Sequence, residues 1–181
     1  MRKSFLAILI VVGWVSLSIA PPAQSGPVLK DGMLPFPTNY TSFPPFLKDI
    51  QKPNAVRDIY INAIGTSAQQ GEQFANESIL VMAIYNAQKD ENGNFKKDHH
   101  GNLIKADLAK IYIMQKGKNW GNHAPSTLKN GDWIYSAFKP NGDRLEVEYT
   151  KCRSCHMPLG NAKDYVHRYD EYFAKRDHHA H

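Results

Sequence analysis

The chain has only two cysteines, Cys152 and Cys155, and no second paired cluster accompanies them. A structural zinc site needs four ligands, which two cysteines reach only with the help of distant histidines. Apart from residues 5–20 no long apolar run occurs, and this one is shorter than the ~20 residues that a membrane-spanning helix needs. Neither charge sign dominates, because 22 Lys and Arg are scattered among 17 Asp and Glu, which argues against nucleic-acid binding. Internal repeats are not evident.

The N-terminus has the pattern of a secretory signal peptide. Arg2 and Lys3 precede the mostly apolar residues 5–20, and Ala23-Gln24-Ser25 offers a small-x-small cleavage site before Gly26. We expect residues 1–25 to be removed, which leaves no membrane span and predicts a periplasmic location. Cleavage after Ala20 and an uncleaved membrane anchor are the alternative interpretations.

Proline is concentrated in the segment that follows. Eight of the 11 prolines lie between Pro21 and Pro53, a density that disfavours helices and central strands. Residues 26–52 are therefore predicted to form an extended arm, and residues 53–181 a single domain. The aromatic residues of the arm indicate that it packs onto that domain; they are Phe36, Tyr40, Phe43 and Phe46.

The domain is predicted to be mainly β (α+β). Four runs rich in β-branched and aromatic residues read as strands, at 56–61, 78–85, 108–114 and 133–138. Several are apolar on both faces, which is typical of a sheet covered on each side. Near the C-terminus, apolar residues at helical spacing predict a short closing helix over residues 162–175.

The two cysteines belong to the run Cys152-Arg153-Ser154-Cys155-His156, the attachment signature of c-type haem. Thiols three positions apart can reach the two vinyl groups of one porphyrin, and the adjacent histidine becomes an axial ligand of the iron. One covalent haem c on Cys152 and Cys155, with His156 on the iron, is therefore the predicted cofactor site. A thioredoxin-like pair would need a βαβ pattern that is missing here. A plain disulfide would leave His156 without a role.

The motif lies near the end of the chain, with 25 residues after His156. Met157 is the only methionine among them, and it is too close to reach the opposite face of the iron. This argues against an electron carrier with a methionine ligand and favours an open axial position. An electron-transfer cytochrome remains an alternative, with His123 or His167 as the second ligand.

Other segments resemble those of the cytochrome P-460 superfamily, in the same order and over about residues 53–170. The resembling segments are Val56–Asn62, Ile79–Tyr85, Met114–Gly117, Gly131–Phe138, and Cys152–His156 with the trailing Asp164-Tyr165-Val166. The resemblance implies a mostly antiparallel sheet, a homodimer and one five-coordinate c-type haem. It also implies one of two functions. Cytochrome P-460 proper oxidises hydroxylamine and has a lysine bonded to the porphyrin, whereas the cytochrome c′-beta branch lacks that bond and binds nitric oxide and similar gases.

Three residues match distal-pocket positions of that superfamily. Met82 stands at the position of the cross-linking lysine, Tyr112 at that of a glutamate, and Arg57 at that of an arginine. Their ordinary roles would be core filler for Met82, a surface residue for Arg57 and a core residue for Tyr112. A thioether cannot form the lysine bond, and a tyrosine with a pKa near ~10 is a poor base at neutral pH.

We therefore predict a periplasmic cytochrome of the c′-beta type that binds nitric oxide, carbon monoxide or a similar gas, and binding is favoured over catalysis. Hydroxylamine oxidation is the alternative function, and a periplasmic redox partner is a further expectation.

Overall fold

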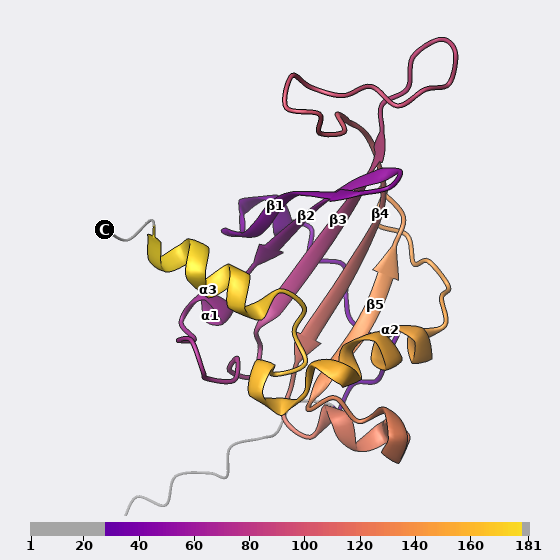
Figure 1. The fold of residues 1–181 in the computed structure, drawn as a ribbon. Coiled ribbons are helices and arrows are strands. Elements are labelled where there is room, and N and C mark those ends of the chain that lie inside the picture. Colours follow the sequence, from indigo (N-terminus) through magenta and orange to yellow (C-terminus); the bar gives the residue numbers. More distant parts are fainter. Residues whose placement is uncertain (1–27, 179–181) are drawn as a thin grey trace, which may run out of the picture.

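The computed structural model describes residues 28–178, so the predicted signal peptide lies outside the described residues. A five-stranded antiparallel sheet forms its centre, and each strand pairs with the next one along the chain (Figure 1). The strands are β1 (Pro45–Lys52), β2 (Ala55–Ile61), β3 (Ile79–Ala87), β4 (Lys105–Lys116) and β5 (Trp133–Phe138). The predicted mainly β, antiparallel fold is confirmed, and the four predicted strands correspond to β2–β5.

The helices are short and concentrated near the C-terminus. The α-helices are α1 (Ala63–Thr66), α2 (Tyr149–His156) and α3 (Tyr169–His178). The 3-10 helices are η1 (Tyr40–Ser42), η2 (Trp120–His123), η3 (Ser126–Leu128), η4 (Met157–Leu159) and η5 (Asn161–Lys163). Helices α2 and α3 lie on one face of the sheet, which we call the front face (Figure 1). Within residues 28–178, no helix has the length and apolar character needed to cross a bilayer.

Both faces of the sheet carry an apolar core. On the front face, side chains of all five strands pack with Val166, Tyr169 and Phe173. On the back face, the N-terminal segment supplies Leu34 and Tyr40, with further aromatic residues packed beside them. A sheet covered on each side was expected from strands that are apolar on both faces. The last eight residues of the predicted arm are themselves the edge strand β1.

The predicted helix over residues 162–175 is wrong in its first half. Helix α3 begins at Tyr169, and the chain before it has left-handed backbone angles at Asp164, Tyr165 and Arg168. The side chain of Asp164 and the carbonyl of Tyr165 are held by tertiary contacts instead, with Lys116 and His156 respectively. These contacts override the helical spacing of the apolar residues in this segment.

Two similar turns project from the sheet between β3 and β4 (Figure 1). In the first, Asp90 accepts hydrogen bonds from the amides of Asn92 and Asn94; in the second, eight residues later, Asp98 accepts from His100 and Asn102. The pairs Asn92-Gly93 and His100-Gly101 are typical of turns, and both turns share the short pattern Asp-x-x-Gly-Asn.

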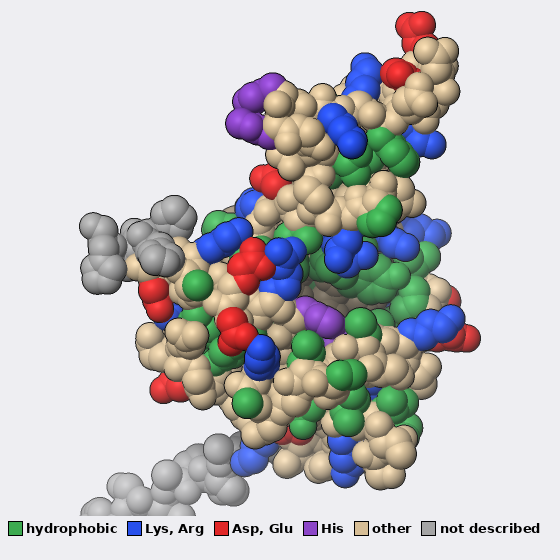
Figure 2. Space-filling view, in the orientation of Figure 1, with side chains coloured by type: hydrophobic (Ala, Val, Ile, Leu, Met, Phe, Trp, Pro, Cys, Tyr) green, Lys and Arg blue, Asp and Glu red, His purple; other side chains and the backbone are tan. Residues whose placement is uncertain are grey.

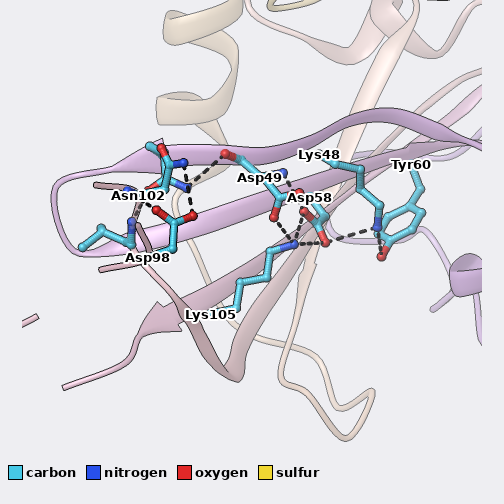
Figure 3. Close-up of polar contacts among 9 residues, drawn as sticks. Lys48, Asp49, Asp58, Tyr60, Asp98, Asn102 and Lys105 are labelled. Atoms are coloured by element: carbon cyan, nitrogen blue, oxygen red, sulfur yellow. Dashed lines mark hydrogen bonds and ion pairs between the residues drawn. The ribbon is translucent and has the colours of Figure 1, made fainter. Parts of the chain in front are cut away.

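The buried carboxylate of Asp58 connects three strands on the back face of the sheet (Figure 3). Asp58 accepts from Lys105 Nζ at 2.7 and 2.8 Å, from Lys48 Nζ at 3.2 Å, and from the Asp49 amide at 3.0 Å. Lys48 also donates to the Tyr60 hydroxyl at 2.6 Å. Because these residues come from β1, β2 and β4, the network fixes three strands relative to one another.

Replacing Asp58 by asparagine is expected to lower the free energy of unfolding at pH 7 by roughly 2 kcal/mol, because two ammonium groups lose a charged acceptor. Burial acts to raise the pKa of the Asp58 carboxyl, but the Asp49 amide, Lys105 and Lys48 bring it below its ordinary value. A carboxyl whose pKa is lower in the folded state stabilises the fold above the ordinary pKa of about 4, and this contribution is lost as the pH falls through the folded-state value. In urea unfolding, the difference in the free energy of unfolding between the wild type and Asp58→Asn should therefore shrink as the pH falls from 7 to 3. A free-energy difference that does not change with pH would contradict this role of Asp58. Glu91→Gln, in the exposed turn, serves as the control.

Candidate haem-binding site

A cavity of about 850 Å³ lies between the front face of the sheet and the chain segment around α2. Residues of all five strands line one side, and residues of α2 and the loop before α3 line the other. Figure 2 shows this face as a hollow bordered by hydrophobic and basic side chains, with a histidine beside it. The volume falls in the range of about 300–1,000 Å³ that small-molecule and cofactor sites occupy.

The sheet side of the cavity is built from rows of side chains that the strand register places next to one another. The inner row, which is buried in the front core, consists of Ile61, Leu80, Met114 and Tyr135, and the last three of these line the cavity. The middle row consists of Ile59, Met82 and Tyr112. The outer row consists of Arg57, Ile84 and Lys110. The three predicted distal-pocket residues, Met82, Arg57 and Tyr112, therefore share one wall, and all three line the cavity.

Helix α2 presents the predicted haem-attachment residues to the same cavity. Cys152, Cys155 and His156 all line it. Residues three positions apart lie on the same side of a helix, which is why both thiols face one space. Both thiols are free in the structure, Cys152 half-buried and Cys155 exposed. Burial raises the pKa of the Cys152 thiol.

One ring nitrogen of His156 forms a hydrogen bond within the protein. Its Nδ1 lies 2.7 Å from the carbonyl oxygen of Tyr165, and its ring packs 5.2 Å from that of Tyr135, centroid to centroid. Nδ1 therefore carries the proton and donates to this carbonyl, which leaves Nε2 as the ring nitrogen with a free electron pair. Burial lowers the pKa of His156 to about 4, so the imidazole is neutral at physiological pH, the form that binds metal ions.

The model of the Cytochrome P460 family matches residues 37–168 of the chain. The chain belongs to the Cytochrome P460 family. The matched region includes η1 and β1, so it begins earlier than the resemblance found in the sequence, which started at about residue 53. No curated protein matches the chain.

Membership of the Cytochrome P460 family implies a haem, and the residues around the cavity fit one. Cys152 and Cys155 supply two free thiols, and His156 supplies an unprotonated ring nitrogen beside them. In addition, the Nε of Arg57 is buried and finds no hydrogen-bond partner within the described part of the chain. An orphaned guanidinium nitrogen in a cavity wall suits a carboxylate or another anion in the cavity.

In this Cytochrome P460 family protein, a buried ion pair holds the loop before α3, whose Tyr165 carbonyl bonds to His156. Lys116 Nζ lies 2.9 Å from both carboxylate oxygens of Asp164, and the amide of Phe74 donates to the same carboxylate at 2.9 Å. Burial raises the pKa of the Asp164 carboxyl, while Lys116 and the Phe74 amide oppose that rise. Asp164 directly precedes Tyr165, so the ion pair fixes the carbonyl that accepts the proton of His156 Nδ1.

A second ion pair fixes α2, the helix with the predicted haem-attachment motif, to the N-terminal segment. The sequence did not predict this pair. Arg153, between the two cysteines, donates to both oxygens of Asp31 at 2.7 and 3.0 Å, and to Asn130 Oδ1 at 2.6 Å. Asp31 belongs to the predicted arm, whose backbone also bonds to β5 from the Gly32 amide to the Tyr135 carbonyl at 2.7 Å. Nothing local in the sequence distinguishes Asp31 or Arg153 from ordinary surface charges, so only their contact reveals this role.

The two histidines considered as second iron ligands differ in position. His123, in η2, is exposed and does not line the cavity. His167 does line it, with its ring 4.7 Å from that of His156 and its Nε2 3.4 Å from Cys155 Sγ. Burial lowers the pKa of His167, and the nearby charges of Lys52 and Arg57 add to this effect. His167 thus belongs to the same wall as His156, whereas two axial ligands must approach an iron from opposite sides.

The zinc alternative finds no support in the side-chain positions. Across residues 28–178, no group of three or more His, Cys, Asp or Glu side chains is placed to hold a metal ion.

Proposed function

We propose that this member of the Cytochrome P460 family is a periplasmic mono-haem c-type cytochrome that leaves one axial position of its iron open and binds nitric oxide or another small diatomic gas. The haem would supply the iron to which the gas binds. Cys152 and Cys155 would hold the haem by thioether bonds, and His156 Nε2 would be the protein ligand. The homodimer and the periplasmic redox partner that the resemblance implies belong to the same proposal.

The observation that supports gas binding best is the composition of the wall opposite His156. Its middle row is Ile59, Met82 and Tyr112, and within residues 28–178 no Asp or Glu side chain lines the cavity. Oxidation of hydroxylamine requires the substrate to lose protons, and a base within hydrogen-bond reach usually accelerates such a step by ~10²–10⁴-fold. A small neutral gas needs no base. The apolar side chains of Ile59 and Met82 would exclude water from the space that the gas enters.

Hydroxylamine oxidation remains the second candidate because lysine side chains line the cavity, among them Lys110 on the sheet wall. Lys110 lies in the outer row on β4, next to the row of Met82. If this chain had a lysine bonded to the porphyrin, Lys110 would be a residue to supply it. A Lys110→Gln variant tests for a bond from this lysine, since loss of such a bond would shift the reduced pyridine spectrum to that of an ordinary c-type haem.

The purified ferric holoprotein is expected to give a high-spin absorption and EPR spectrum, and the ferrous form is expected to bind carbon monoxide and nitric oxide. The reduced pyridine spectrum should be that of an ordinary c-type haem in both the wild type and Lys110→Gln. Turnover of hydroxylamine should be negligible, because no carboxylate base from the described part of the chain lines the cavity.

Three results would count against this function. A low-spin ferrous spectrum that carbon monoxide leaves unchanged would favour the electron carrier with a second histidine ligand. Robust hydroxylamine oxidation, or a red-shifted ferrous Soret band that Lys110→Gln abolishes, would favour the enzyme.

A further inference from the structure

Among the described residues, the cavity is lined by basic side chains and by no acidic one. The basic residues are Lys52, Arg57, Lys110, Lys151 and Arg168. Two of them have acidic partners on their own helices or turns, because Lys151 pairs with Glu148 and Arg168 with Glu171. The other three form no ion pair with any residue in the range 28–178. The cavity therefore holds an excess of positive charge.

Two of these unpaired cations lie in the cavity wall itself. Arg57 on β2 and Lys110 on β4 are each paired in register with Ile84 on β3, so they flank it in the outer row. Neighbouring strands are about 4.8 Å apart, which puts the two backbone positions roughly 10 Å from each other. Both side chains are half-buried, and the Nε of Arg57 has no partner within the described residues. The next row, toward the core, is that of Met82.

We propose that this cavity selects small inorganic anions, of the size of azide or nitrite, as ligands of the ferric protein, with Arg57 and Lys110 stabilising their charge. The inference rests on the proposed function, because it needs the open axial position.

The count of charges in the cavity favours the binding of an anion even when a haem is present. A haem brings two carboxylates, which can neutralise two of the three unpaired cations, Lys52, Arg57 and Lys110. One positive charge remains beside an apolar wall formed by Ile84 and Met82. A cleft of one charge sign with low-dielectric walls concentrates its field and raises the local concentration of the opposite ion. The guanidinium of Arg57 adds directed hydrogen-bond donors, which are strongest toward an ionised acceptor.

The experiment compares a charged and a neutral ligand of ferric haem. Azide, nitrite and imidazole are titrated into the ferric holoprotein, for the wild type, Arg57→Gln, Lys110→Gln and the control Lys139→Gln. Lys139 is an exposed lysine just after β5 that does not line the cavity. Glutamine keeps the size and polarity of the side chain but removes its charge. Circular dichroism and thermal unfolding check that each variant is folded.

We expect Arg57→Gln and Lys110→Gln each to weaken azide and nitrite binding by roughly tenfold, the effect of one hydrogen bond to a charged group. Imidazole binding should stay within about twofold in all variants, and Lys139→Gln should behave as the wild type, since an exposed distant charge is screened. Raising the ionic strength should weaken anion binding to the wild type but leave imidazole binding unchanged.

Two outcomes would overturn the inference. If neither variant changes the affinity for azide and nitrite, Arg57 and Lys110 only neutralise the haem carboxylates. If the affinities for azide and imidazole fall together, the variants disturb the site without any selectivity for charge. Carbon monoxide binding to the ferrous holoprotein separates the two proposals. Failure to bind it would defeat the proposed function, whereas carbon monoxide binding without anion selectivity would defeat only this inference.

Discussion

Replacing Asp164 by alanine is expected to lower the free energy of unfolding by about 3–5 kcal/mol, the usual cost of removing one partner of a buried ion pair. The side chains of Lys116 and Asp164 are only 8% and 1% exposed, so the variant leaves an ammonium group in the core without its counter-ion. The amide of Phe74 loses its acceptor as well. Urea unfolding of the holoprotein, followed by circular dichroism, measures the loss.

The chain contains a matched control for this experiment. Lys163 and Asp170 form the same type of ion pair at the surface, with side chains 45% and 59% exposed. Asp170→Ala should cost less than about 1 kcal/mol, because exposed pairs contribute little. The double variant Lys116→Met with Asp164→Leu should recover part of the stability, since it removes the unpaired charge, while the Phe74 amide stays without its acceptor and leucine is strained at the left-handed backbone of position 164. Equal effects of Asp164→Ala and Asp170→Ala would show that the buried pair has no special role.

The same ion pair is expected to position His156, the proposed haem ligand. Asp164→Asn should weaken the hold on the neighbouring Tyr165 carbonyl, and with it the hydrogen bond from His156 Nδ1. A hydrogen bond of this kind raises the basicity of a metal-bound imidazole, which favours the ferric state. The midpoint potential of Asp164→Asn should therefore be higher than that of the wild type, while Asp170→Asn should leave it unchanged. A loss of stability with an unchanged potential would reduce the pair to a purely structural role.

Replacing both Cys152 and Cys155 by alanine is expected to abolish covalent haem attachment. The mass of the exported wild-type protein should equal the mature chain, starting at Gly26, plus one haem, whereas the double variant should show the chain alone. Each single variant keeps one thiol beside the cavity and should retain a haem through one thioether bond. Acidified organic solvent should extract haem from the double variant only.

Ser154→Ala is the matched control for the cysteine variants. Ser154 lies between the two cysteines on α2, but its hydroxyl donates to the Thr150 carbonyl at 2.8 Å, and it does not line the cavity. It should keep the full mass of chain plus haem. A wild-type protein with no added haem mass would remove the basis of the proposed function.

Most of the fold could be predicted from local sequence, and the residues proposed to bind haem came from a local motif. Strands β2–β5 were predictable because β-branched and aromatic runs favour extended backbone wherever they occur. The candidate haem-attachment residues come from a motif of five consecutive positions, Cys152 to His156, so they can be proposed without knowledge of the fold. The candidate distal residues Met82, Arg57 and Tyr112 came from the family resemblance, and the strand register then placed them on one wall.

Other features could be found only in the folded chain, since they join residues that are far apart in sequence. Lys116 and Asp164 are separated by 48 positions, and Asp31 and Arg153 by 122. Periodicity gives no information about such pairs, because it reports the apolar side of an element and not the partner of a charge. For the same reason the closing helix was placed seven residues too early: the spacing of its apolar residues is helical, but the ion pair of Asp164 and the carbonyl bond of Tyr165 require a different backbone. The positive character of the cavity arises in the same way, from Arg57 and Lys110 on separate strands that the register of β2, β3 and β4 brings to either side of Ile84.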